Sequence, residues 1–239
     1  MMRNSVVQHP RLKNNIRPMS RIAENLCRIR AEVPHGVELV AVSKFHPVEA
    51  LREAYDAGQR VFGESRVNEL VAKAATLPGD IRWHFIGHLQ TNKVKQVVGK
   101  VALIQSVGSL PLLEAVEKEA EKQDIVQDIL LEVNIGGEEA KSGFAPESLE
   151  QAAEEAKKCA NVRVRGLMCI PPVAEGEHGS LPYFEKVHAL FVDINAKLYD
   201  NTLDILSMGM SGDYEDAVRA GATMVRVGTA IFGARNYTI

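Results

Sequence analysis

The chain has 239 residues, 46% of them hydrophobic and 25% charged, which is ordinary for a globular protein with one sizeable core. The formal net charge is −3, and residues 1–23 contain arginine and lysine but no acid, so the remainder is acidic and we expect no nucleic-acid partner. No apolar run approaches the roughly 18 residues that span a bilayer, so we expect no membrane partner either.

The first 18 residues are polar and basic and show no hydrophobic period. An arginine-bearing, acid-poor leader is typical of a transit peptide. The alternative is a disordered tail or a true start at Met19, and we favour it because the segment has a single serine and no amphipathic stripe. We therefore expect a disordered leader over 1–18 and a folded domain over 19–239, whose first helix follows Ser20 and ends near Pro34.

From residue 37 onward, short runs rich in Val, Ile and Leu alternate with helical patterns. Gly, Pro or Ser residues bound most of these runs, which is typical of strands. The eight predicted strands are 37–43, 60–62, 81–86, 101–106, 127–133, 162–168, 203–207 and 223–227. Three of the helices between them are predicted to open at Ser109, Pro146 and Ser180.

The alternation of strands and helices predicts an α/β fold with parallel strands, because each crossover between parallel strands requires a helix. Eight such units favour a single (β/α)8 barrel, here with an extra N-terminal helix. The alternative is a doubly wound open sheet. It would be favoured by a glycine-rich turn after the first strand, where this chain reads AVSKFHP.

In a barrel of this kind the active face lies at the C-terminal ends of the strands. Lys44 closes the first predicted strand and shares its alternation with Val40 and Val42, so it points to the same side as they do. Desolvation there would favour the neutral amine that a Schiff-base lysine needs. The alternative is a lysine that extends from the strand end into solvent.

The loops after the seventh and eighth predicted strands can hold an anion. Ser211 is the predicted N-cap of a helix that begins near Asp213, and its hydroxyl and the amides around Gly212 are also suited to an anion. Gly228 permits close approach of the backbone, and Thr229 begins a helical turn with unpaired amides. Barrels commonly bind phosphate at these two loops, so together they predict a phosphate site.

Arg226 lies inside the otherwise apolar eighth strand. If it points inward it needs a partner, either a structural carboxylate or a ligand atom. We interpret His84, on the third strand, as a hydrogen-bonded core histidine. It lacks metal-ligand spacing to His88 and His178, so we expect no metal.

Several motifs occur together, in the same order, in one known family. They are VSKFHP (42–47), FGE (62–64), WHFIGHLQTNK (83–93), GLM (166–168), SMGMSGD (207–213), RVG (226–228) and IFGAR (231–235). From about Met19 to Tyr237 the chain resembles the pyridoxal phosphate homeostasis (YggS/PROSC) family. The resemblance implies a (β/α)8 barrel of the alanine racemase N-terminal type.

The resemblance also implies residue roles. Lys44 would carry pyridoxal 5′-phosphate (PLP) as a Schiff base. Ser211, Gly228 and Thr229 would contact its phosphate, and Arg226 would face the pyridine nitrogen. The chain departs from the family at two places: Ser65-Arg66 replace a frequent Asn-Tyr, and His88 replaces a frequent Pro.

An arginine on the pyridine nitrogen disfavours its protonation, so the ring would be a poor electron sink. Racemisation would need a second base, which alanine racemase takes from a C-terminal domain of a partner subunit, and we expect no such domain in a chain that ends at Ile239. The leading hypothesis is a non-enzymatic carrier that buffers PLP or delivers it to apo-enzymes. A PLP-dependent amino-acid racemase and a cofactor-free Schiff-base aldolase are the alternatives.

The three cysteines, Cys27, Cys159 and Cys169, form no CxxC pair. This usage is typical of a reduced, cytoplasmic protein without structural zinc. We expect a cytoplasmic monomer.

Overall fold

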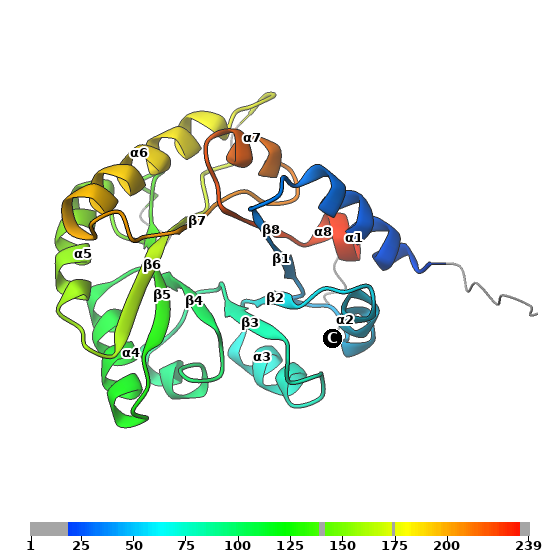
Figure 1. The fold of residues 1–239 in the computed structure, drawn as a ribbon, viewed down its shortest axis with the longest axis horizontal. Helices are drawn as coiled ribbons and strands as arrows, with labels where there is room; N and C mark the ends of the chain where they lie inside the picture. Colours follow the sequence, from blue (N-terminus) through cyan, green and yellow to red (C-terminus); the bar gives the residue numbers. More distant parts are fainter. Residues whose placement is uncertain (1–18, 139–141, 174, 235–239) are drawn as a thin grey trace, which may run out of the picture.

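The computed structural model describes residues 19–138, 142–173 and 175–234. Eight parallel strands form a closed barrel in chain order, and helices surround it (Figure 1). The predicted (β/α)8 barrel is confirmed, and the open doubly wound sheet is wrong. The predicted disordered leader over 1–18 and the last five residues of the predicted domain lie outside the described residues.

Each strand overlaps one predicted run. The strands are β1 (Glu38–Val42), β2 (Val61–Glu64), β3 (Arg82–Phe85), β4 (Leu103–Val107), β5 (Gln127–Val133), β6 (Val162–Cys169), β7 (Ile205–Ser207) and β8 (Met224–Val227). The barrel closes where β8 pairs with β1, with Arg226 opposite Val40 and Val227 opposite Ala41. This closure places the loop after β8 beside the loop after β1.

The helices that fill the connections are α1 (Arg21–Glu32), α2 (Val48–Asp56), α3 (Val67–Ala74), α4 (Leu110–Lys122), α5 (Leu149–Lys157), α6 (Leu181–Leu198), α7 (Tyr214–Arg219) and α8 (Thr229–Phe232), with short 3-10 turns η1 (Thr91–Gln96) and η2 (Pro146–Ser148). Ser20 and Ser109 cap α1 and α4 through their side chains, and Pro146 opens the turn that leads into α5. Ser180 precedes α6 but makes no capping bond. Its backbone is already helical (φ −79°, ψ −20°), whereas a capping side chain normally needs an extended backbone.

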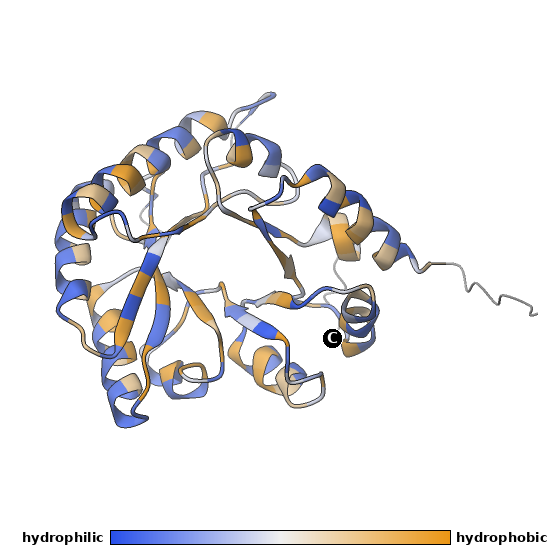
Figure 2. Cartoon of the chain, in the orientation of Figure 1, coloured by the Kyte–Doolittle hydropathy of each residue, from blue (hydrophilic) through white to orange (hydrophobic). Residues whose placement is uncertain are grey.

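The core has two layers. A small cluster fills the barrel interior, formed by Val40, Val61, Leu103, Leu130, Met168 and Met224. A larger cluster lies between the strands and the helices, and Figure 2 shows hydrophobic stretches along the strands and mixed faces on the surrounding helices. Burial of both faces of each strand explains why the predicted strands are nearly continuous apolar runs.

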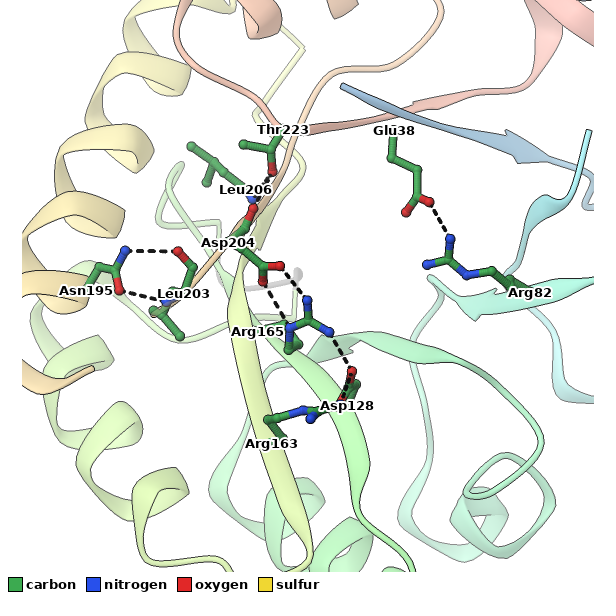
Figure 3. A network of polar contacts seen from close by, with 10 residues as sticks. All are labelled: Glu38, Arg82, Asp128, Arg163, Arg165, Asn195, Leu203, Asp204, Leu206 and Thr223. Carbon is green, nitrogen blue, oxygen red and sulfur yellow. Dashed lines mark hydrogen bonds and ion pairs between the residues drawn. The ribbon is translucent and has the colours of Figure 1, made fainter. Parts of the chain in front are cut away.

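An ion-pair network ties strands together at their N-terminal ends (Figure 3), whereas Lys44 follows the C-terminal end of β1. Asp128 accepts from Arg163 Nε at 2.6 Å and from Arg165 Nη1 at 2.8 Å, and Arg165 also pairs with Asp204. Burial alone would raise the pKa of Asp128, but hydrogen bonds from the two arginines hold it below its usual range. This face therefore stabilises the fold and leaves the opposite face for a ligand.

Two features of the fold concern membrane contact and the state of the cysteines. None of the helices in the described ranges combines the length and apolar character needed to cross a membrane. Cys27, Cys159 and Cys169 are all free thiols.

Candidate functional site

The loops after β7, β8 and β1 meet at one side of the barrel mouth. Lys44 follows β1 and is half-buried. Gly228 follows β8 and lies so close to β1 that a Cβ there would be 3.3 Å from the carbonyl oxygen of Val42. The predicted lysine and the predicted phosphate loop are therefore neighbours, because the barrel closes between them.

Ser211 joins the loop after β7 to the loop after β8. Its Oγ accepts hydrogen bonds from the amides of Gly228 at 3.2 Å and Ala230 at 3.3 Å. The prediction that Ser211 caps α7 is wrong, because a tight turn separates it from that helix. In this turn the amide of Asp213 donates to Met210, and the Asp213 carboxylate accepts from the Met210 amide at 2.6 Å.

Unpaired amides surround this hydroxyl. Within the described ranges, the backbone N–H groups of Ser211, Gly212 and Thr229 have no hydrogen-bond partner. A Cβ on Gly212 would meet no atom within 4 Å, so the space beside it is open. Free amides on two neighbouring loops suit an anion. We call Ser211, Gly212, Gly228 and Thr229 the cradle; its geometry fits the predicted phosphate site, which stays a prediction.

Arg226 is buried inside the barrel and is held by uncharged oxygens. Its Nη1 donates to Ser207 Oγ at 2.7 Å and its Nη2 donates to the Cys169 carbonyl at 2.8 Å. No carboxylate in the described part of the chain contacts the guanidinium, so the structural-carboxylate alternative is wrong. Burial lowers the pKa of Arg226. Its Nε has no partner among the described residues and remains a donor for a ligand atom.

A line of neutral side chains fixes Arg226 from behind. The Ser207 hydroxyl donates to Gln105 Oε1 at 2.7 Å, and Gln105 Nε2 lies 2.9 Å from His84 Nδ1. Burial lowers the pKa of His84 to about 3, so the imidazole is neutral and accepts from the amide. The interpretation of His84 as a hydrogen-bonded core histidine is confirmed.

Several of these polar groups were not predicted from the sequence. Gln105 interrupts the apolar strand β4, and Ser207 ends the apolar strand β7. Nor were Lys73 and the buried carboxylate of Glu64 predicted, which lie behind the Lys44 segment 2.7 Å apart. Polar residues inside apolar strands were the available signal, because a buried polar group requires a partner.

A cavity of about 700 Å³ opens beside the Lys44 segment, towards α2 and α3. The positions at which the chain departs from the resembling family line it. The Arg66 guanidinium stacks 4.1 Å above the Phe45 ring, and His88 Nδ1 lies 2.9 Å from Ser142 Oγ. Ser65, Arg66 and His88 all line this cavity, and none of the four cradle residues does.

No group of three or more potential ligands that could hold a metal occurs in the described ranges.

Comparisons with known proteins give a consistent result. The family "Alanine racemase, N-terminal domain" matches residues 18–236. A pyridoxal phosphate homeostasis protein of Aquifex aeolicus is 44% identical over 223 residues, which cover 92% of this chain and 97% of that protein. A protein of the same name from Pseudomonas aeruginosa is 41% identical over 233 residues, covering 92% and 98%.

Solved structures agree with this result. PipY of Synechococcus elongatus without PLP has a TM-score of 0.84 at 38% identity, covering 89% of this chain and all of that chain (100%). PipY with PLP bound has a TM-score of 0.81 over the same shares. An alanine racemase of Clostridium difficile has a TM-score of 0.73 at 16% identity, covering 92% of this chain and 57% of that chain, which is a likeness of fold alone.

Proposed function

The chain belongs to the alanine racemase N-terminal domain family and, within it, to the pyridoxal phosphate homeostasis proteins, and we propose from this premise that it binds PLP through Lys44 and acts in PLP homeostasis. One observation carries the site assignment. Lys44 lies next to the cradle, where the barrel closes between β8 and β1. An amine and an anion site are thus available to one small molecule.

The residues present fit this cofactor. A phosphate dianion needs several converging donors, and the cradle offers the Ser211 hydroxyl and the free amides of Ser211, Gly212 and Thr229. Gly228 keeps the two loops close, because a side chain there would press on Val42. Arg226 has five N–H donors and uses two of them in the bonds to Ser207 and Cys169, so others, including Nε–H, remain for the lone pair of a ring nitrogen.

When bound, the cofactor supplies an aldehyde, with which a neutral lysine amine can form a carbon–nitrogen double bond as water leaves. Lys44 is the side chain that we assign to this bond, because it follows β1 at the mouth and is half-buried. The bond requires the neutral form of this amine. Ser211 and its neighbouring amides would hold the phosphate meanwhile, so binding and covalent attachment reinforce each other.

Arg226 would keep the ring nitrogen unprotonated. Its guanidinium donates and cannot accept a hydrogen bond; its two hydrogen bonds go to uncharged oxygens, and the Asp213 and Glu132 carboxylates act on it only from beyond contact distance. An unprotonated ring is a poor electron sink, so this chain would hold the cofactor without strong catalysis of its own. The names of the relatives, which describe homeostasis, support the same conclusion.

The cellular role follows from this proposal. The protein would be a cytoplasmic monomer that buffers PLP or delivers it to PLP-dependent apo-enzymes. Three free thiols support a reducing compartment, in which unpaired cysteines persist.

Borohydride reduction of the full chain loaded with PLP, followed by peptide mass mapping, tests the assignment. We expect a single adduct, on Lys44, and loss of the visible absorption band in Lys44→Ala. Lys93→Ala is the matched control, because Lys93 is also half-buried and lines the adjacent cavity. An adduct on Lys93 or Lys141 in place of Lys44 would show that the site is assigned wrongly.

A further inference from the structure

We propose that Lys73 is a positioning residue for Lys44, holding the backbone on both sides of it so that the amine is presented at the barrel mouth. Lys73 itself would touch no cofactor. The inference rests on the proposed function, because it concerns how well Lys44 reacts.

Lys73 projects from α3 into a buried site behind the end of β1. Its ammonium donates to three acceptors, the Ser43 carbonyl at 2.9 Å, Glu64 Oε1 at 2.7 Å and Glu69 Oε2 at 2.9 Å. The side chain is only 7% exposed. A lysine has three N–H donors, so every donor is used and the ammonium has one well-defined position.

The residue before Lys44 is fixed by this cluster. Ser43 is fully buried, its carbonyl accepts from Lys73, and its hydroxyl donates to Glu64 Oε1 at 2.7 Å. Its amide continues the sheet by donating to Gly63 at 3.0 Å. All the polar groups of Ser43 are therefore held, which leaves the peptide that leads into Lys44 no freedom to rotate.

The residue after Lys44 is fixed by the same cluster. The Phe45 amide donates at 2.9 Å to Glu69 Oε2, the oxygen that also accepts from Lys73. Phe45 has a φ of +64°, a left-handed conformation that a bulky side chain rarely adopts. Such a conformation persists only where its surroundings enforce it. The bond to Glu69 contributes to holding this conformation, together with the Arg66 guanidinium that stacks on the Phe45 ring, and Lys73 holds Glu69.

These anchors lie on both sides of Lys44. Ser43 faces the buried cluster behind β1, and Lys44 follows it outside the strand, in a turn in which the His46 amide donates to the Ser43 carbonyl at 3.1 Å. A buried ion pair adds little stability over an apolar pair of similar size. The cluster therefore acts through geometry. It fixes the backbone from Ser43 to Phe45 and thereby positions the Lys44 amine.

The test compares Lys73→Met with Lys197→Met in the full chain. Lys197 also pairs with a carboxylate one helical turn away, Asp193, but on the exposed surface of α6. Two quantities are measured, the rate at which the covalent PLP band appears and the affinity for pyridoxine 5′-phosphate. This analogue has an alcohol in place of the aldehyde, so it reports on the cradle and cannot react with Lys44.

We expect Lys73→Met to slow formation of the band roughly tenfold to hundredfold, as a misplaced reacting group does. Its affinity for pyridoxine 5′-phosphate should change little, Lys73→Arg should restore part of the rate, and Lys197→Met should match the wild type. An unchanged rate in Lys73→Met would overturn the inference. Equal losses of rate and of analogue affinity would also overturn it, because they indicate a merely structural role.

Glu69→Ala is the second variant and decides the matter if Lys73→Met does not fold. The Glu69 side chain is 23% exposed, and its removal spares the pair between Lys73 and Glu64 while releasing the Phe45 amide. We expect the same selective loss of rate; a wild-type rate contradicts the inference. An adduct on another lysine in the wild type would instead contradict the proposed function, so the two failures are distinguishable.

Discussion

Inside the barrel, Nη1 of Arg226 donates a hydrogen bond to the hydroxyl of Ser207 at 2.7 Å, where a carboxylate would be the ordinary partner of a buried guanidinium. Because Ser207 in turn donates to Gln105, the arginine is oriented without being neutralised. A cation that no carboxylate of the described residues contacts thus lies deep in the barrel mouth, with Asp213 and Glu132 acting on it from a greater distance.

We predict that Ser207→Ala lowers the free energy of unfolding by about 1–3 kcal/mol, because it strands a donor of Arg226 and an acceptor of Gln105. Urea denaturation measures the change. Ser148→Ala is the control, since its hydroxyl makes one exposed hydrogen bond to Ala145. Equal losses of unfolding free energy in the two variants would show that the buried bonds among Arg226, Ser207 and Gln105 add no more stability than an exposed hydrogen bond.

Ser211→Ala should weaken PLP binding about tenfold to hundredfold, because a hydrogen bond to a charged group contributes about 1.5–3 kcal/mol. Pyridoxal has no phosphate, so its binding should be weaker from the outset and should change little in the variant. Spectrophotometric titration with each compound gives the comparison. A similar loss for both compounds would place Ser211 outside the phosphate site.

The chain should not catalyse exchange at the α-carbon of amino acids. Arg226 would leave the ring nitrogen unprotonated and therefore weakly electron-withdrawing. Incubation of the loaded protein with L-alanine in deuterated water, followed by NMR, measures the exchange. Rapid deuterium incorporation or D-alanine formation that disappears in Lys44→Ala would favour the racemase instead.

Asp128→Asn should destabilise the protein at neutral pH by about 1–3 kcal/mol, because it weakens the bonds to Arg163 and Arg165. The folded-state pKa of Asp128 is lowered, so its contribution is present above the unfolded pKa and is lost as the pH falls through the folded value. The difference from the wild type should therefore shrink below about pH 4. Urea denaturation across pH measures it, with the exposed Asp56→Asn as control; a difference independent of pH would contradict the prediction.

A chain that begins at Met19 should keep the melting temperature and PLP affinity of the full chain. Residues 1–18 show no apolar period that could pack on the barrel. Differential scanning calorimetry and PLP titration of both chains test this. A clear loss of either property would mean that the leader contributes to the fold or the site.

The barrel and the place of Lys44 could be predicted from the sequence because both depend on local patterns. Eight apolar runs separated by helices leave few parallel topologies, and in a barrel the end of the first strand must lie beside the end of the eighth. Lys44 and Gly228 follow these two strands, so the closure of the barrel alone brings them close together.

The contacts between side chains could not be predicted in the same way. Ser211 was expected to cap the helix that follows it in sequence, yet its hydroxyl accepts from the loop after β8, a contact between residues 17 and 19 positions apart. The partners of Arg226 likewise come from β6 and β7. Such pairings depend on the three-dimensional positions of distant residues, about which spacing along the chain says little.

The hydrogen bonds that Ser211 accepts from Gly228 and Ala230 have a consequence for release of the cofactor. A hydroxyl of the chain itself occupies these two donors, and the space beside Gly212 is open. Departure of the phosphate would therefore leave the amides of Gly228 and Ala230 paired. A site whose donors stay paired when the ligand leaves suits a protein that must release its cofactor.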